Sequence, residues 1–222
     1  MNCKNIWKCH KRTGGVTMSD KTEKRMVENY EITHSIQIGD KEVVFGVNEK
    51  ADMPYLCAFY SNNSIFESYH ECMVGDDYAE IIELFADRVK AQCIKVHEEQ
   101  AKVTVPREDI TAQMCIPMFK CGDIVGKVMA VKAQALRPEY RSAEHQLIYV
   151  TGGNGARKNS LGSACYCITL YSGEHGRWAR YDLQGEVKPE CLPEWAKKCL
   201  IEIQRQQKEK NVSNQERKQE VR

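Results

Sequence analysis

The stretch from His145 to Tyr181, HQLIYVTGGNGARKNSLGSACYCITLYSGEHGRWARY, decides the fold. Three apolar segments in it, at 145–150, 164–171 and 177–181, are separated by two polar loops that contain glycine. Short apolar runs bounded by turn residues are typical of β-strands, so the stretch predicts a twisted antiparallel sheet. The longer loop is rich in Gly, Asn and Ser, and loops held on rigid strands are common binding sites. No catalytic signature accompanies it.

The remaining patterns favour an α+β protein, because strands come in runs and helices are segregated from them. Alternation predicts a hairpin with its turn at Gly39-Asp40, a type II′ turn, and a helix that opens near Asp76-Asp77 and ends near Gln100. We expect an N-terminal antiparallel sheet with one long helix, then a small antiparallel β-sheet or half-barrel, then a C-terminal helix. Further strands are predicted at 55–60, 65–73 and 123–131, and a helix after Pro193 with a disordered tail after about Gln207. The corresponding domains are 1–29, a leader or flexible basic arm; 30–102, the hairpin sheet and helix; 103–190, the β unit; and 191–222, the C-terminal helix and tail.

Charge is unevenly distributed along the 222 residues. Residues 1–17 hold four basic and no acidic residues, and residues 196–222 hold eight basic and four acidic ones. Since the whole chain has a net charge of +1, the stretch 18–195 carries −7. A body this acidic repels phosphate, which disfavours simple nucleic-acid binding. Gly14-Gly15-Val16-Thr17 matches a translated ribosome-binding sequence, so we hypothesise that Met18 is the authentic start; the alternative is a flexible basic arm.

The sequence contains no apolar run of the roughly 18 residues that span a membrane and no apolar signal segment. We therefore expect a cytoplasmic protein whose eleven cysteines are reduced thiols. Cys115, Cys121, Cys165 and Cys167 offer four thiolates for zinc, although their spacing is unlike that of common zinc sites. The other interpretation, small buried hydrophobes, fits equally. We expect no metal and no cofactor. A thiol nucleophile in the sequence His70-Glu71-Cys72 is a further possibility without a recognised motif.

Two segments are candidate binding surfaces. The loop from Thr151 to Ala156 offers backbone amides for an anion, with basic residues next to it, or is simply a wide connection that needs positive φ. The strand Arg177–Tyr181 interleaves cations with aromatic rings, as base-stacking surfaces do, or is an ordinary edge strand. The predicted binding residues are Thr151, Gly152, Gly153, Asn154, Arg157, Lys158, Asn159, Arg177, Trp178 and Arg180. The acidic region 71–100 either mimics the spacing of nucleic-acid phosphates toward a nucleic-acid-binding partner or is simply the solvent-exposed face of a helix.

Five segments resemble a known group of proteins: YEITHSIQIGDKEVVFGV, DMPYLCAFYSNNSIF, VGDDYAEIIELFADRV, LRPEYRSAEHQLIYVTGGNGA and VKPECLPEWAK. Over about residues 28–200 the chain is similar to an uncharacterised accessory protein family of conjugative and integrative mobile elements of Firmicutes. The resemblance implies no catalytic residues. It implies an accessory role, which on such elements includes antagonism of restriction or CRISPR immunity. The segment before Met18 departs from the family pattern.

These observations together predict a non-enzymatic binding protein of a mobile genetic element, an inhibitor of a host defence nuclease (restriction or CRISPR). Its expected partner is a basic, nucleic-acid-handling protein, reached through the acidic surface and the loop 151–162 and steered by charge. The alternative is a small nucleic-acid-binding module that uses the Arg177–Tyr181 strand and the Gly-rich loop. An enzyme is the third possibility, and no membrane association is expected.

Overall fold

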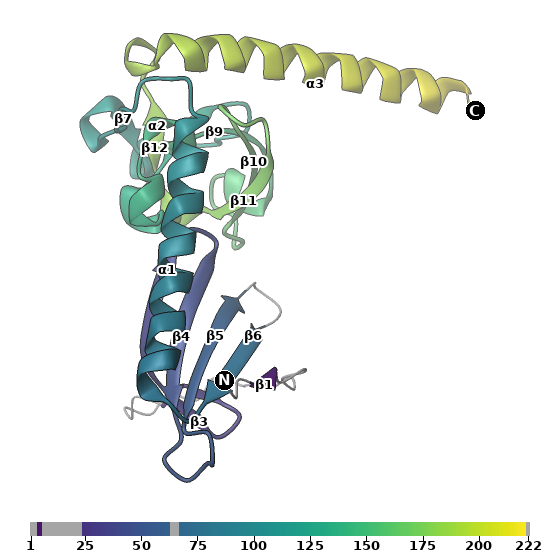
Figure 1. Cartoon of the computed structure of the whole chain (residues 1–222). Coiled ribbons are helices and arrows are strands. Elements are labelled where there is room, and N and C mark those ends of the chain that lie inside the picture. The colour runs from purple at the N-terminus through teal and green to yellow at the C-terminus, as the bar shows by residue number, and fades with distance from the viewer. Residues whose placement is uncertain (1–3, 6–23, 63–66, 221–222) are drawn as a thin grey trace. The chain divides into compact units, whose positions relative to one another are not determined.

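The computed structural model describes residues 4–5, 24–62 and 67–220, and the chain divides into two compact units, Met1–Val103 and Thr104–Arg222. Each unit is built on its own antiparallel sheet, and the two long helices, α1 (Tyr78–Ala101) and α3 (Glu194–Glu220), each follow a sheet in the chain (Figure 1). This confirms the predicted α+β class and its order of elements. Of the N-terminal segment 1–17, only β1 (Lys4–Asn5), which pairs with β6, is described, so the hypothesis of a leader lies outside the described residues.

The sheet of the first unit has the strand order β1-β6-β5-β4-β3-β2. Its further strands are β2 (Met26–Val27), β3 (Tyr30–Ile38), β4 (Lys41–Val47), β5 (Tyr55–Asn62) and β6 (Glu67–Gly75). The hairpin of β3 and β4 turns at Gly39-Asp40 as predicted, with Gly39 at φ 61°. Strand β2 lies inside the range 1–29, which the sequence predicts as a leader or arm. Since Val27 is buried in the core of the sheet, this end of the range is part of the fold.

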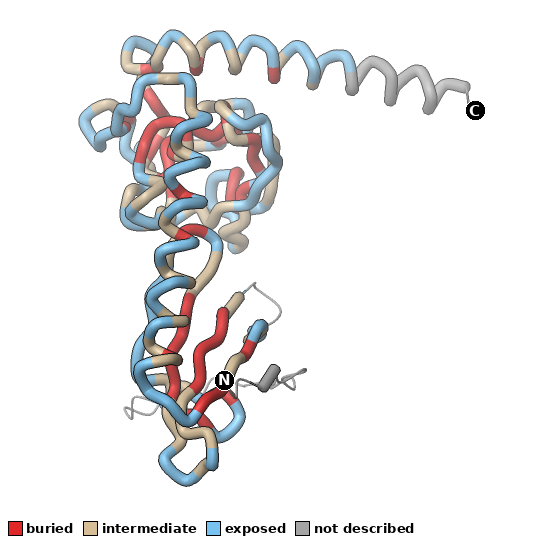
Figure 2. Tube along the Cα trace, viewed as in Figure 1, coloured by how far each residue is buried: buried red, intermediate tan, exposed pale blue. Residues whose placement is uncertain are grey.

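Helix α1 (Tyr78–Ala101) packs on one face of this sheet (Figure 1). The carboxylate of Asp77 accepts hydrogen bonds from the amides of Ala79 and Glu80, which is the cap that the sequence predicts. Both faces of β4 and β5 are buried (Figure 2). Val43, Phe45, Cys57 and Phe59 form a core with Ile81 of α1, and Val44, Leu56 and Ala58 form a second core on the opposite face.

The sheet of the second unit has the strand order β11-β10-β9-β8-β12-β7. The strands are β7 (Cys115–Pro117), β8 (Val128–Val131), β9 (Leu147–Gly152), β10 (Ala164–Thr169), β11 (His175–Ala179) and β12 (Leu183–Val187). The helices of this unit are α2 (Ala143–Gln146) and α3 (Glu194–Glu220), with 3-10 turns η1 (Ala112–Met114), η2 (Met118–Lys120), η3 (Ala133–Ala135), η4 (Pro138–Tyr140), η5 (Asn154–Ala156), η6 (Arg180–Asp182) and η7 (Pro189–Cys191). No helix in the described part of the chain is long and apolar enough to cross a membrane.

Three boundaries in this unit differ from the sequence prediction. Strand β8 begins only at Val128, because Gly126 turns the chain with φ 78° and its amide binds the carbonyl of Val150. Strand β11 ends at Ala179, and Arg180 begins η6. Helix α3 continues to Glu220, whereas the sequence predicts a disordered tail after about Gln207. Neither Gly nor Pro interrupts the sequence of α3, and Arg205 lies within 4 Å of both Glu202 and Glu209 on the helix surface.

Apolar side chains are buried on both sides of the second sheet. One core contains Leu147, Ile168 and Val187 together with Ala196 and Ile203 from the start of α3. The other contains Met129, Ile148, Val150 and Cys165 inside the curled part of the sheet. Because both faces are filled, the strands that carry the Gly-rich loop form a rigid base for it.

Candidate binding surfaces

The Gly-rich segment packs tightly against the start of β10. Gly153 has φ 103°, and a Cβ there would lie 2.3 Å from the carbonyl oxygen of Ala164. A Cβ on Gly155 would lie 2.1 Å from the carbonyl oxygen of Ser163. Such distances are far inside van der Waals contact, so both positions require glycine. The positive φ that the predicted alternative requires is found at Gly153, whereas Gly155 is required by the close approach of the Ser163 backbone.

Arg180 fastens this segment to its neighbours instead of facing solvent. Its guanidinium donates hydrogen bonds to the carbonyl of Gly155 at 2.7 Å, of Gly122 at 2.8 Å and of Cys121 at 3.2 Å. Its backbone amide binds the carbonyl of Ser163. A planar guanidinium suits this task because its N–H groups diverge in a fixed fork. Arg180, which the sequence suggests as a binding residue, therefore has a structural role: its hydrogen bonds hold three segments of the chain together.

Residues beyond the glycines form the exposed tip of the loop. Arg157, Lys158 and Asn159 are exposed, and Leu161 is completely exposed. The carboxylate of Asp123 accepts a hydrogen bond of 2.7 Å from the amide of Lys158. This amide lies outside the predicted anion nest of residues 151–156, and it already binds a carboxylate of the protein. Thr151 and Gly152 complete β9 and are half-buried, whereas Asn154 is exposed in η5.

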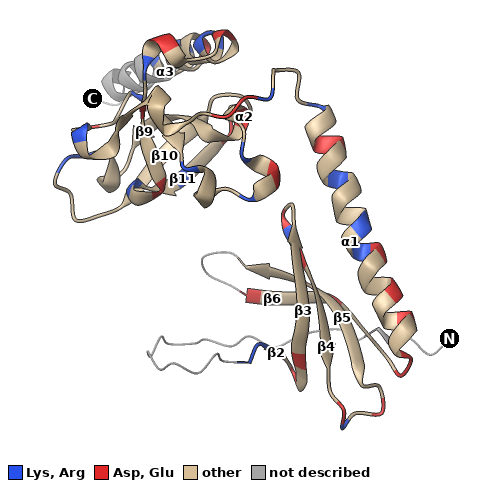
Figure 3. Ribbon diagram, turned by 90° about the vertical axis from the view of Figure 1, so that its left-hand side faces the viewer, with Lys and Arg blue, Asp and Glu red and all other residues tan. Residues whose placement is uncertain are grey.

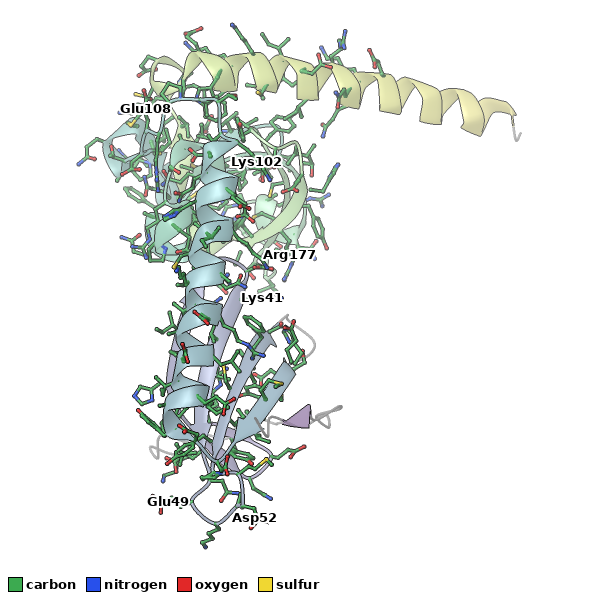
Figure 4. All side chains as sticks on the ribbon, viewed as in Figure 1. Lys41, Glu49, Asp52, Lys102, Glu108 and Arg177 are labelled. Carbon is green, nitrogen blue, oxygen red and sulfur yellow. The ribbon has the colours of Figure 1, made fainter. Side chains whose placement is uncertain are left out.

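The predicted cationic and aromatic strand divides between two roles. Trp178 packs against the core inside the curled sheet. Arg177 on β11 is exposed and extends outward (Figure 4). Its partner on the neighbouring strand β10 is Tyr166, whose side chain is also exposed. Of the residues chosen for base stacking, Trp178 and Arg180 therefore have structural contacts, and Arg177 is accessible.

Two further aromatic rings are exposed in this unit. Tyr181 ends the strand that is predicted to stack on bases, although it is not among the predicted binding residues, and Phe119 belongs to neither prediction. Phe119 in η2 is 84% exposed and Tyr181 in η6 is 70% exposed. Phe119 follows the apolar run Ile116-Pro117-Met118, of which Ile116 is exposed and Met118 half-buried, so hydrophobicity alone does not show which side chains face solvent. Lys120 lies beside Phe119, with its ammonium 5.8 Å from the ring centroid.

The cysteines of the described residues are free thiols, and burial raises several of their pKa values. Desolvation raises the pKa of Cys57, Cys115 and Cys165, and it raises the pKa of Cys167 to about 11. Of the four candidates for zinc, Cys115 belongs to the core with α3, while Cys121, Cys165 and Cys167 belong to the core inside the curled sheet. Among the described residues, no three His, Cys, Asp or Glu side chains are grouped as metal ligands. The interpretation as small buried hydrophobes accounts for these positions.

Two other groupings of polar residues lack the geometry of a nucleophile and base. The ring of His70 stacks on Phe59, which belongs to the core under α1, whereas Cys72 belongs to the core on the opposite face. In the second unit the hydroxyl of Ser142 donates to the buried carboxylate of Glu144 at 2.6 Å, and His145 lies 4.0 Å from the same oxygen. The serine hydroxyl is therefore paired with an acid and not with the imidazole.

The acidic charge of the protein is concentrated in the first unit. Residues 24–103 contain fifteen acidic and eight basic residues, whereas residues 104–193 contain nine acidic and eleven basic ones. Glu80, Glu83 and Asp87 lie three and four positions apart in the first half of α1, so they follow one side of the helix; we call them the acidic face (Figure 3). Glu83 and Asp87 are exposed. At a rise of about 1.5 Å per residue, the three carboxylates are spread over about 10 Å.

Comparison of the chain with protein-family models, with curated proteins and with solved structures finds no match.

Proposed function

We propose that this chain is a non-enzymatic binding protein of a mobile genetic element, and that its partner is a basic, nucleic-acid-handling protein of the host. The observation that carries the proposal is the charge of the first unit, fifteen acidic against eight basic residues in 24–103. A surface of this sign attracts proteins that bind phosphate, because such proteins present lysine and arginine at their own sites. The acidic face of α1 offers three carboxylates over about 10 Å, the axial length occupied by about three phosphates of one strand at about 3.4 Å each.

The thiol chemistry supports a binding role. A nucleophilic cysteine needs a lowered pKa, an exposed position and a nearby base. Cys57, Cys165 and Cys167 are instead buried, and desolvation raises the pKa of each. These thiols stay protonated at neutral pH and serve as apolar packing groups.

The mobile-element setting and the kind of partner come from the resemblance of residues 28–200 to accessory proteins of such elements. A mobile-element protein that binds a basic nucleic-acid enzyme would protect the element by inhibiting a restriction or CRISPR nuclease in the cytoplasm. Occupation of the nuclease's phosphate-binding surface would block its substrate. The inhibitor needs no reaction centre of its own.

The test is retention of host proteins on the immobilised full-length chain, with proteins identified and quantified by mass spectrometry. The variant Glu83→Lys/Asp87→Lys reverses two charges of the acidic face. Its matched control, Glu49→Lys/Asp52→Lys, reverses two exposed charges on the turn between β4 and β5 (Figure 4). Because like charges that face each other cost several kcal/mol, we expect the first variant to retain roughly a tenth or less of the wild-type amount of a basic nuclease, and the control to retain most of it.

A retained nuclease is then assayed with and without the purified chain, and we expect wild-type protein and the control to inhibit cleavage. The proposal is wrong if no basic nucleic-acid-handling protein is retained, or if both variants lose it equally.

A further inference from the structure

Three segments of the second unit meet around the guanidinium of Arg180; we call this place the Arg180 junction. They are 118–124, 153–158 and 180–182. Arg180 binds carbonyls of Cys121, Gly122 and Gly155 at 2.7 to 3.2 Å. The amide of Ile124 binds the carbonyl of Ala156 at 2.9 Å, and Asp123 binds the amide of Lys158. These contacts fix the three backbones against one another, so the side chains that they carry outward keep their relative places.

The exposed side chains at the Arg180 junction are aromatic rings and cations. Phe119 and Tyr181 have 84% and 70% of their surface exposed, and they come from two of the three joined segments. Exposed apolar residues that are scattered singly need no explanation, but these two rings stand on segments that hydrogen bonds hold together. The same joined segments also carry the exposed cations Lys120, Arg157 and Lys158, and Lys132 donates to the carbonyl of Tyr181 at 2.5 Å.

The charge of this unit permits contact with phosphate. Residues 104–193 contain two more basic than acidic residues, in contrast to the first unit. Asp123 lies at the junction, but its carboxylate is committed to the amide of Lys158. The repulsion that the sequence predicts from one acidic body therefore applies to the first unit and not to this surface.

We propose that the Arg180 junction binds single-stranded nucleic acid, with bases stacked on Phe119 and Tyr181 and phosphates beside Lys120, Arg157 and Lys158. This site goes beyond the proposed protein partner, which concerns the other unit. Base stacking on exposed rings combined with lysines and arginines along the backbone is how sequence-tolerant single-strand sites work. Unpaired bases are required, because the faces of bases in a duplex are already stacked.

The same surface fits an acidic protein segment less well. Recognition of carboxylates relies on paired N–H groups of arginine, and the guanidinium of Arg180 uses its donors on backbone carbonyls. Two of the exposed cations on these segments, Lys120 and Lys158, are lysines, which bind phosphate as point charges. Phe119 and Tyr181 expose flat ring faces that suit planar bases.

The test is fluorescence anisotropy with the full-length chain and labelled 16-residue oligomers of deoxythymidine and of uridine, at 50 mM and 200 mM salt. We expect binding at 50 mM salt that weakens at 200 mM. Each of Phe119→Ala and Tyr181→Ala is expected to weaken binding about fivefold or more, since that is the lower range for a stacked base. Tyr181→Phe, which keeps the ring, should bind as the wild type does. The matched control is Tyr166→Ala, which removes a 54% exposed ring from β10.

The phosphate contacts are tested by the salt dependence. Arg157→Gln/Lys158→Gln should make the slope of log affinity against log salt smaller by about 1.4, because each contact with a single strand contributes about 0.7. Arg177→Gln, on β11, should leave the slope unchanged. The deoxythymidine and uridine arms show which nucleic acid binds more tightly.

The proposal is overturned if neither oligomer binds at 50 mM salt, or if Tyr166→Ala weakens binding as much as Phe119→Ala and Tyr181→Ala do. It is also overturned if polyglutamate of equal length displaces the oligomers at equal concentration, which would assign the surface to an acidic protein. All variants change exposed side chains, and unchanged thermal unfolding midpoints would show that a loss of affinity is not a loss of folding.

Discussion

Several residues that look like ligand-binding groups in the sequence have structural tasks in the fold. Gly153 and Gly155 allow the backbone to approach β10, and Arg180 joins three segments through their carbonyls. Glycine clusters and arginines are also common in binding loops, so residue type alone does not separate the two uses. The structural use and the binding use are distinguished only by the atoms that lie within contact distance of the residue in the fold.

Replacement of Gly155 tests this account of the loop. Gly155→Ala should lower the free energy of unfolding by about 1–3 kcal/mol, because the new Cβ would overlap the carbonyl of Ser163. Gly152→Ala is the matched control, since a Cβ there meets nothing within 4 Å, and it should change the free energy by no more than about 0.5 kcal/mol. Urea unfolding followed by circular dichroism measures both. Equal effects of the two substitutions would contradict the packing argument.

His70 predicts a pH dependence of stability. Its pKa is lowered from the ordinary value of 6.5, first by burial and then by the charge of Lys41. The folded state therefore binds a proton less readily than the unfolded chain, so the contribution of His70 to stability is full above about pH 6.5 and declines as the pH falls through the unfolded value toward the folded one.

The measurement is the urea midpoint at pH 7.5 and at pH 5. The fall in midpoint between these values should be smaller for His70→Gln than for the wild type, because glutamine does not titrate. Parallel pH profiles of the two proteins would show that His70 is not responsible.

At the scale of elements, the sequence predicts best where the signal is local. The β3–β4 hairpin has a period of two and a glycine at the turn, and α1 has a capping aspartate and an apolar stripe. These elements have the predicted positions. The start of β8, which follows the turn at Gly126, and the end of β11 were placed wrongly, because contacts distant in sequence set them: Gly126 binds Val150, and Arg180 binds Cys121. The Arg180 junction was not predictable for the same reason, since three segments must first be brought together.

The cap of α1 gives a prediction at this scale. Asp77→Ala should lower the free energy of unfolding by about 1 kcal/mol, because the amides of Ala79 and Glu80 lose their acceptor. Asp76→Ala removes the neighbouring exposed carboxylate and should have a smaller effect. Thermal unfolding followed at 222 nm compares the two variants. A larger effect at Asp76 would place the cap one residue earlier.

At the scale of the whole molecule, the division into two units changes the meaning of the charge. The sum over 18–195 describes one acidic body, but residues 24–103 of the first unit carry a net charge of −7 and residues 104–193 of the second carry +2. This difference in net charge cannot be seen in the sequence until the boundary between the two units is known. The two units therefore suit ligands of opposite sign, a basic protein for the first and a phosphate backbone for the second.

The most direct test of the account is site-specific photocrosslinking in the native host. A photoreactive phenylalanine at position 83, on the acidic face of α1, is compared with the same residue at position 49, on the turn between β4 and β5. We predict that position 83 crosslinks to a basic, nucleic-acid-handling protein and that position 49 does not. Crosslinks to the same proteins from both positions, or none from position 83, would contradict a partner bound on the acidic face.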